Sequence, residues 1–566
     1  MKYKASGTLK VFENRQHFIY LNRILDSINR TCYQCKTFDL LTTLVKYDLP
    51  CDVLRIRLGG ILLNLNIEMT QESVVNPSTL SIFGIFILTV IIVKICQYWL
   101  NQNKQPPGPF GFPLVGHLPL LGSNPSVKCM QLAKKYGDIF RIRMGSWPTV
   151  VLNSRTAIRE ALVKQSEIFS DRPEFFSSKV TNDMRSLGFG SYTPRWRLHS
   201  KIASTVLREF ASPKKPTTEQ IILMEAEKLV EHFIKTAQET FNPHEEIFLA
   251  VGSVIYQICY GMDKNCRQDK GYMHLIKNTK TMQEFARAGN PFDVMPWLRF
   301  IMPQKANQFV QILKTLRHSI DLVVKEHIQT YDENHLRDVT DGLIHADLKY
   351  TKDSRKNHGI TKSDIFSSLQ DFLGGGFDTS STTLEWIILY LGHYTDIQLK
   401  IQKEIEDVIG SRNVTLQDMG TLPFTEATIL EVQRISPVVA IGIPHAASCN
   451  TVLRNYEIKK GTVVLCNFYS TTRDSTIWEN PDEFLPQRFL DKHNRIIAEK
   501  EEKLLTFSTG RRRCPGDFLA KMELFLFVVN IFQKCKIKLE SDPNFEGIFG
   551  LTYGPKPYLI KVNPRQ

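Results

Sequence analysis

The sequence predicts a mainly helical domain with a minor β-sheet, preceded by one apolar segment long enough to cross a membrane. Segments with apolar residues at helical spacing dominate the chain, and the longest are 220–240, 310–332, 365–393 and 517–532. Short runs typical of strands are few, namely 139–144, 149–152 and 462–465. The uncharged stretch that opens residues 80–100 has no counterpart elsewhere in the chain.

Composition excludes several classes of protein. The 566 residues are 42% hydrophobic and 23% charged, as in an ordinary folded protein, which excludes a disordered, collagen-like or polytopic membrane protein. Eleven irregularly spaced cysteines predict mostly free thiols in a reducing compartment. The formal net charge of +13 fits an anionic membrane surface, an acidic protein or nucleic acid. Because no basic–aromatic module occurs, we expect no nucleic-acid partner.

The N-terminal part divides into an extension, residues 1–79, and a candidate transmembrane anchor, residues 80–100. Lys94 is the only charge in the anchor, whose 21 residues would rise about 31 Å as a helix, enough to cross a bilayer. A buried core helix is the alternative. Basic residues after the span predict that the rest of the chain is cytosolic. We expect the first 68 residues to be a dispensable extension or a mis-assigned upstream start, with Met69 as the true start.

A proline-rich hinge, residues 101–113, follows the anchor. Four prolines within eight residues, from Pro106 to Pro113, prevent a continuous helix and favour a stiff connector. Residues 114–566 contain no repeat, low-complexity segment or obvious linker, so we expect them to form one large domain.

The segment from Phe507 to Gly516, FSTGRRRCPG, carries the clearest chemistry. Gly510 and Gly516 let the backbone close around whatever the Cys514 sulfur binds. Three arginines and a following helix start are expected to favour the thiolate of Cys514. A thiolate in a tight loop is an electron-donating axial ligand for haem iron. The alternative for a lone cysteine is a small buried hydrophobe.

This segment resembles the haem-binding signature of the cytochrome P450 monooxygenases, in which Phe507, Gly510, Arg512, Cys514 and Gly516 occupy the matching positions. The resemblance covers about residues 106–562. It implies the helical P450 fold, haem as cofactor with Cys514 as its metal ligand, and Phe507, Gly510 and Gly516 as residues that hold the cofactor.

The resemblance also implies a structural triad behind the haem. Glu431 and Arg434 share a helix face at i and i+3, and Arg488 follows in a Pro-x-Arg-Phe segment. A carboxylate bridged by two guanidiniums would lock the core.

Three consecutive glycines, residues 374–376, interrupt the helical pattern of 365–393. Each costs a helix about 0.5–1 kcal/mol relative to alanine, so a reason is needed. In the family this site is a widened groove where dioxygen binds, and the catalytic acid–threonine pair beside it, here Asp378 and Thr379, delivers protons.

Four residues are implied partners of the haem carboxylates: Arg172, Trp196, His445 and Arg512. The family pattern places an arginine four residues after the tryptophan, where this chain has Ser200. One haem carboxylate is therefore expected to lose a bidentate partner, or to use Lys201 as a less precise point charge.

The substrate pocket is expected to be mostly apolar, which fits a lipophilic substrate. By family position its wall draws on Val180, Leu187, Phe189, Asp371, Gly374, Gly375, Val439, Ala440, Ile441, Leu551 and Thr552. Several segments look most like the animal microsomal group, which holds steroid 17-alpha-hydroxylase and the aryl-hydrocarbon and drug-oxidising enzymes.

The resemblance thus implies a single-pass enzyme of the endoplasmic reticulum membrane that inserts one atom of dioxygen into a steroid-like or xenobiotic substrate. Its electrons would come from NADPH through cytochrome P450 reductase, and cytochrome b5 is a second candidate partner. The basic residues Lys201, Arg511 and Arg513 are expected to dock these acidic proteins. Two alternatives are a haem-thiolate isomerase or dehydratase that works without oxygen, and a non-catalytic membrane protein that binds haem or lipid.

Overall fold

The computed structural model describes residue 89 and residues 104–212, 215–237, 239–261, 266–286, 290–350 and 358–565. All elements below belong to one compact unit, Ile95–Gln566. The predicted extension and nearly all of the predicted anchor lie outside the described residues. No helix within the described ranges is both long and apolar enough to cross a membrane. The described part of the predicted hinge, residues 104–113, contains no helix.

Helices make up most of this unit, as the sequence predicts. The shorter ones are α5 (Leu118–Leu121), α7 (Arg155–Arg159), α8 (Ser166–Phe169), α9 (Phe176–Asn182), α14 (Pro291–Val294), α15 (Leu298–Ile301), α21 (Phe468–Thr471) and α22 (Ala498–Lys503). The longer ones are α6 (Pro125–Tyr136), α10 (Pro194–Phe210), α11 (Pro216–Lys235), α12 (His244–Tyr260), α13 (Lys270–Ala286), α16 (Pro303–Gln329), α17 (Val339–Tyr350), α18 (Lys362–His393), α19 (Thr395–Val408), α20 (Pro423–Ile435) and α23 (Asp517–Lys534).

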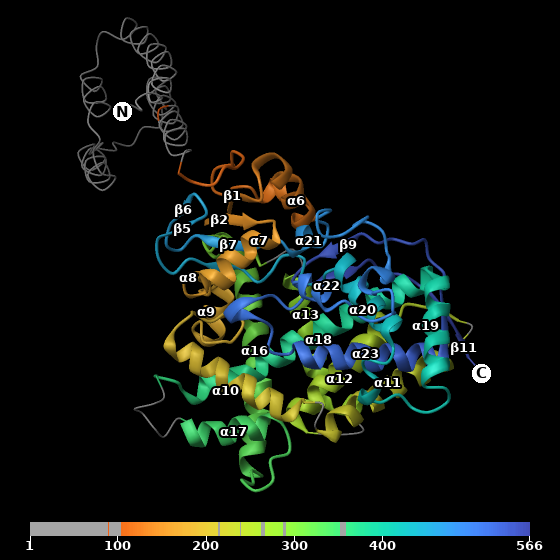
Figure 1. The fold of residues 1–566 in the computed structure, drawn as a ribbon. Coiled ribbons are helices and arrows are strands. Elements are labelled where there is room, and N and C mark those ends of the chain that lie inside the picture. The colour runs from red at the N-terminus through yellow and green to blue at the C-terminus, as the bar shows by residue number, and fades with distance from the viewer. Residues whose placement is uncertain are drawn as a thin grey trace, which may run out of the picture. The chain divides into compact units, whose positions relative to one another are not determined.

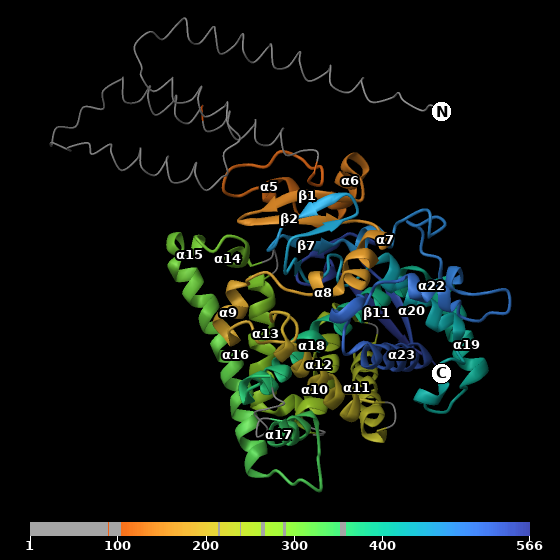
Figure 2. The same ribbon diagram turned by 60° about the vertical axis from the view of Figure 1, so that its left-hand side comes forward.

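The strands form small sheets, and the largest has the order β1-β2-β7-β4. Its members are β1 (Ile139–Met144), β2 (Trp147–Leu152), β7 (Val463–Cys466) and β4 (His445–Ala446). The others are β3 (Thr240–Phe241), β11 (Ile560–Pro564) and β8 (Cys535–Leu539) in one sheet, the pair β5 (Thr451–Leu453) and β6 (Tyr456–Ile458), and the pair β9 (Gly547–Phe549) and β10 (Tyr553–Pro555). Figures 1 and 2 show β1, β2 and β7 at one end of the unit and α10 and α17 at the other.

Helix α18 is the centre of the main core. Its 32 residues would span about 48 Å, and its apolar side chains pack with those of α11, α12 and α23 in one cluster. A capping box starts it, because the Thr361 hydroxyl accepts the Asp364 N–H while the Asp364 carboxylate accepts the Thr361 N–H. This long, capped and buried helix provides a rigid support for the residues on its surface.

Most of the predicted elements occur with shifted ends. The segment predicted at 365–393 is α18, and the segment predicted at 517–532 is α23. The prediction of one helix over 220–240 is wrong at its end, since α11 stops at Lys235 and Thr240 pairs with Lys561 of β11. Tertiary strand pairing overrides the local helical pattern there.

Candidate functional site

The cysteine loop, residues 507–516, is held in shape by its own backbone. The Cys514 N–H donates to the Phe507 carbonyl at 3.0 Å. Gly510 adopts a φ of +77°, and a Cβ at this position would collide with the Leu162 carbonyl oxygen. Only glycine meets both requirements, which is why the loop needs it. The loop ends directly at the first residue of α23.

Cys514 keeps an exposed surface, but its pKa is not lowered as the sequence suggested. The protein packed around the thiol raises its pKa above the ordinary value, while the Gly516 N–H and the Arg513 charge lower it by less. Asp517 adds a further upward effect. The expected effect of the loop is present, since Arg513 and the Gly516 N–H favour the thiolate, but desolvation by the surrounding protein outweighs it.

A cationic cluster lies beside this loop and contains the four predicted haem-carboxylate partners. The Arg512 guanidinium stacks on the Trp196 ring, with 3.7 Å between its carbon and the ring centroid. Arg172 is buried and donates to the carbonyls of Ile443 and Pro444, next to His445 in β4. The structure thus brings together residues that lie as far apart as 172 and 512 in the sequence.

Electrostatics show that this cluster carries excess positive charge. Burial lowers the pKa of Arg172 to about 10. Burial also lowers the pKa values of Arg512 and His445 well below their ordinary ranges, and Arg172 lowers both further by repulsion. The charge of Asp171 opposes this effect at both Arg172 and Arg512. Such a cluster gains stability from anionic partners.

The short segment Ser186–Gly190 connects the cationic cluster to α18. Its carbonyls accept hydrogen bonds from the cluster: Arg172 donates to Gly188 at 2.8 Å, and Arg512 and Trp196 both donate to Leu187, at 2.8 and 3.1 Å. On its other side the Leu187 N–H donates to Asp371 of α18 at 2.7 Å.

Asp371 has the environment of a buried acid. Desolvation raises its pKa to about 7, although backbone N–H groups of Leu187 and Gly188 and the Arg512 charge act in the opposite direction. The sequence nominated this residue as pocket wall. Nothing in the sequence signalled its backbone partners, because any residue type can supply an amide.

The three glycines of α18 differ in what surrounds them. A Cβ at Gly376 would crowd the Ile255 side chain of α12, so packing alone explains this glycine. A Cβ at Gly374 or Gly375 would meet no protein atom within 4 Å. Helix packing therefore leaves Gly374 and Gly375 unexplained, whereas a groove for a small ligand explains them.

The acid–threonine pair follows these glycines. The Thr379 hydroxyl donates to the Gly375 carbonyl at 2.6 Å. The Thr552 hydroxyl, in the turn between β9 and β10, donates to the Asp378 carboxylate at 2.7 Å. Desolvation raises the pKa of Asp378, and Thr552 and His244 oppose that rise. The sequence analysis predicted Asp378 as a catalytic residue and Thr552 as a pocket residue, and it predicted no contact between them.

A second hydrogen bond ties α18 to the helix that follows the cysteine loop. Ser380, next to Thr379, donates to Glu523 of α23 at 2.8 Å. Glu523 is buried, which raises its pKa to about 8. Together with the chain Arg512–Leu187–Asp371, this bond fixes the cysteine loop and the glycine segment of α18 to the same framework. Sequence reasoning missed Glu523, although an acid in the middle of an apolar helix was a visible signal.

Glu431, Arg434 and Arg488 meet in a fully enclosed ion-pair network. Arg434 donates to both Glu431 oxygens at 2.7 and 2.9 Å, and Arg488 Nε donates to Oε1 at 2.9 Å. The Leu485 N–H supplies a fourth hydrogen bond at 2.8 Å. The carboxylate and one guanidinium are completely buried.

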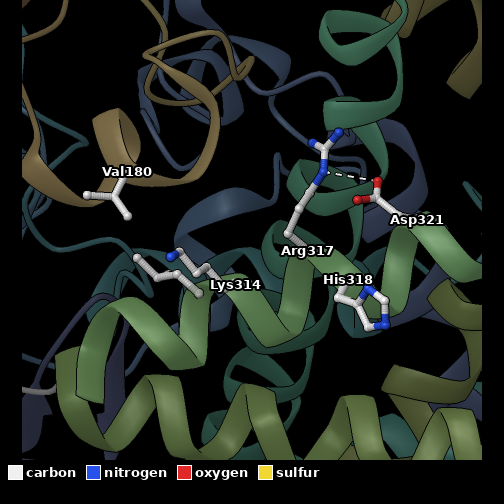
Figure 3. A pocket seen from close by; sticks show the side chains of 6 residues that line it. Val180, Lys314, Arg317, His318 and Asp321 are labelled. Carbon is white, nitrogen blue, oxygen red and sulfur yellow. Dashed lines mark hydrogen bonds and ion pairs between the residues drawn. The ribbon is translucent and has the colours of Figure 1, made fainter. Parts of the chain in front are cut away.

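The other nominated pocket residues fall into two groups. Ala440 is buried and Val439 half-buried in the segment after α20, and the Tyr553 N–H donates to the Val438 carbonyl, which brings Leu551 and Thr552 to that segment. Val180 lines a pocket of about 140 Å³ with the α16 side chains Leu313, Lys314, Arg317, His318 and Asp321 (Figure 3). Mostly charged side chains surround Val180, unlike the apolar wall that the sequence suggested.

Ser200, which stands where the family pattern has an arginine, lies on α10. Five residues of helix turn Lys201 about 140° away from Trp196, and Lys201 is exposed. His199 points to α18 instead, where its Nε2 lies 2.8 Å from the Ser368 hydroxyl. Burial lowers the pKa of His199 to about 4. Neither neighbour of Ser200 therefore replaces the arginine.

A family model for Cytochrome P450 matches residues 106–562. The chain belongs to the cytochrome P450 family. Animal members are similar over most of its length: cytochrome P450 1A1 of Homo sapiens is 34% identical over 488 residues, 83% of this chain and 94% of that protein. Cytochrome P450 1A5 of Gallus gallus is 34% identical over 79% of this chain and 87% of that protein. Cytochrome P450 1B1 of Mus musculus is 31% identical over 88% and 94%.

This membership confirms the resemblance inferred from the cysteine segment. As a cytochrome P450 the protein is a monooxygenase, an oxidoreductase with haem as cofactor and a cysteine thiolate as axial ligand. The residues present fit that group. A thiol on a fixed loop lies beside the buried Arg172 and the half-buried Arg512, which need anionic partners, and two glycines of α18 leave the backbone uncovered.

Proposed function

We propose that this cytochrome P450 inserts one atom of dioxygen into a C–H bond of a lipophilic molecule, steroid-like or xenobiotic, with electrons from NADPH delivered by a reductase. One observation carries the proposal. The cysteine loop, the cationic cluster and the acid–threonine segment are joined by hydrogen bonds through Leu187 and Glu523.

Cys514 is the proposed iron ligand, and bound haem would supply the iron that binds and activates dioxygen. The Gly516 N–H that donates to the sulfur stabilises the thiolate form. Arg172, Trp196, His445 and Arg512 would hold the two haem carboxylates, and Phe507, Gly510 and Gly516 would shape the loop. Anionic partners would raise the lowered pKa values of His445 and both arginines towards their ordinary ranges, so binding is coupled to charge relief.

Asp378 and Thr379 are the proposed proton donors of the reaction. The overall change is RH + O2 + NADPH + H⁺ → ROH + H2O + NADP⁺, so protons must reach the oxygen atom that leaves as water. The raised pKa of Asp378 keeps a proton available nearer neutral pH than an ordinary carboxyl would. Thr552 orients the Asp378 carboxylate, and Thr379 remains anchored to its own helix through Gly375.

The proposed substrate is lipophilic because the pocket wall offers little free polarity. Its two polar members, Asp371 and Thr552, are already hydrogen-bonded to Leu187 and Asp378. Apart from Val180, which faces the charged side chains of α16, the remaining predicted members are apolar or glycine: Leu187, Phe189, Gly374, Gly375, Val439, Ala440, Ile441 and Leu551. An apolar ligand loses no hydrogen bonds to water on entering such a site.

We also propose that the protein is a single-pass enzyme of the endoplasmic reticulum with a cytosolic catalytic domain. Large apolar side chains are exposed at Phe110, Phe112 and Leu114, and again at Phe300 and Ile301. Both segments attach to the turn between β1 and β2: the Gly145 N–H donates to the Val115 carbonyl and the Ser146 N–H to the Val294 carbonyl. Such an apolar surface favours a lipid surface as neighbour.

The proposed electron donors are cytochrome P450 reductase and cytochrome b5. Lys201, Arg511 and Arg513 are exposed, as a docking surface for acidic proteins requires. Arg511 pairs with Glu167 and Arg513 with Asp517, which leaves the local charge partly neutralised. Charge reversal at Lys201 is expected to raise the KM for reductase at low salt without changing the carbon monoxide spectrum.

The decisive test compares Cys514→Ser with Cys449→Ser, since Cys449 is also exposed and free. We expect Cys514→Ser to lose the carbon monoxide absorption typical of thiolate-ligated haem and the NADPH-dependent oxygen consumption, and Cys449→Ser to keep both. A Cys514→Ser protein that retains the thiolate spectrum would refute the assignment. Product formation without NADPH would instead favour the isomerase or dehydratase, which the presence of Asp378 and Thr379 argues against.

A further inference from the structure

A second carboxyl group lies on the same face of α18 as Asp378. Glu385 follows seven residues later, so the two are separated by about 10.5 Å along the helix axis and about 20° around it. The Glu385 side chain is 8% exposed. The Tyr558 hydroxyl donates to the Glu385 backbone carbonyl and leaves the carboxyl group to other partners.

The first residue of α12 connects this buried carboxyl group to solvent. His244 Nδ1 lies 2.9 Å from Glu385 Oε1, and the His244 side chain is 56% exposed. The neighbouring wall is apolar, because the His244 ring lies 6.3 Å from that of Phe248, which contacts Phe377, the residue before Asp378. A group that touches both water and a buried carboxyl group can move protons between them.

His244, Glu385 and Asp378 act on one another electrostatically, and His244 also lowers the pKa of its neighbour Glu245, which pairs with Lys280. The hydrogen bond to Glu385 raises the pKa of His244, Asp378 raises it further, and Lys280 of α13 opposes the rise. Desolvation raises the pKa of Glu385. His244 acts against this rise, and the charge of Asp378 adds to it. His244 also lowers the pKa of Asp378. Each of the three groups therefore responds to the charge of the other two.

We propose that His244 and Glu385 form the solvent end of the proton supply to Asp378. The proposal rests on the proposed role of Asp378 in the reaction. The imidazolium breaks its Nδ1–H bond as Glu385 Oε1 gains the proton, and the exposed ring then takes another proton from water. Glu385 passes its proton along the face of α18 through water, since about 10.5 Å of helix is too far for direct transfer.

The His244–Glu385 pair differs in its location from another His–carboxylate pair of the molecule. His327 and Asp338 form a similar contact, 3.0 Å long, but join α16 to the residue before α17. No interaction between that pair and Asp378 is among those that influence the Asp378 pKa. His327→Gln is therefore the matched control for a His–carboxylate pair without the proposed role.

The test uses dioxygen itself as probe, so it needs no identified substrate. The full-length haem-loaded protein is combined with NADPH and a P450 reductase, and NADPH oxidation, hydrogen peroxide release and water formation are measured in H2O and D2O. For His244→Gln and Glu385→Gln we expect loss of water formation on the order of tenfold at pH 7.5, a larger peroxide fraction and a larger solvent isotope effect. His327→Gln should match the wild type in all three.

A second measurement does not depend on turnover. NMR titration of labelled histidines, with His244→Gln to assign the signal, should show a lower His244 pKa in Glu385→Gln and a smaller decrease in Asp378→Asn. Water formation should decline at a lower pH in Glu385→Gln than in the wild type. Unchanged peroxide fraction and isotope effect, or a His244 pKa insensitive to Asp378→Asn, would overturn the proposal. If the wild-type protein itself showed no thiolate spectrum or no NADPH-dependent oxygen consumption, the proposed function would be refuted instead.

Discussion

Replacing Glu431 by glutamine tests the enclosed ion-pair network most directly. The carboxylate accepts four hydrogen bonds, three from Arg434 and Arg488 and one from the Leu485 N–H. Glutamine keeps the size but replaces one acceptor oxygen by an N–H2 group that faces a guanidinium. Both arginines then remain buried without a counter-charge.

The expected loss follows from this geometry. Breaking a buried pair by removing one partner costs about 3–5 kcal/mol, because the remaining charge stays desolvated. A domain has only about 5–15 kcal/mol of stability, so Glu431→Gln should unfold at a clearly lower urea concentration. Far-UV circular dichroism and haem absorption, followed together, measure the change by two independent probes.

Asp407→Asn is the control for this experiment. Asp407 pairs with Lys403 at 3.4 Å, and both side chains are mostly exposed. Removing such a surface pair should cost no more than about 0.5 kcal/mol. If Glu431→Gln lost no more stability than Asp407→Asn, the reasoning about buried charge in this network would be refuted.

Three further predictions concern the site. Gly510→Ala should fail to retain haem or lose at least about 2 kcal/mol of stability, since its backbone is left-handed and a Cβ has no room; haem retention on gel filtration measures this, and normal retention would contradict it. Asp371, whose folded pKa is about 7, binds its proton more tightly than in the unfolded chain, so wild-type stability should fall from pH 5 to 7.5; Asp371→Asn keeps an acceptor for the Leu187 N–H and should show a weaker fall in urea titrations. Glu523, with a pKa near 8, is mostly protonated at pH 7 and accepts from Ser380, so Glu523→Gln should cost less than about 1 kcal/mol there and gain on the wild type as pH rises to 8; a large loss at pH 7 would show a charged Glu523.

Sequence reasoning predicted those parts of the site that depend on side-chain identity. Cys514 and its glycines stand in one continuous motif, and Glu431 with Arg434 shares a helix turn, so local spacing was sufficient. Arg172 and His445 came from family positions, and the structure gathers them beside Arg512. In each case the chemistry belongs to the side chain that the sequence names.

The remaining parts depend on backbone groups, desolvation or distant pairing. The carbonyls of Leu187 and Gly188 are acceptors for the cationic cluster, and a carbonyl is present whatever the residue type. The Cys514 pKa depends on how closely the protein surrounds the sulfur, which no count of nearby arginines reveals. The contact of Asp378 with Thr552 joins positions 174 residues apart, and only tertiary structure defines it.

The segment Ser186–Gly190 has a thermodynamic consequence. Its amide at Leu187 is bound by α18 and its carbonyls by Arg172 and Arg512, so a ligand that displaces Leu187 breaks bonds on both sides at once. A ligand that displaced Leu187 would therefore alter the free energy with which these arginines bind carboxylates. By linkage, carboxylates held by those arginines alter the affinity for that ligand by the same factor. In the proposed function, substrate binding and haem retention would therefore share one coupling free energy.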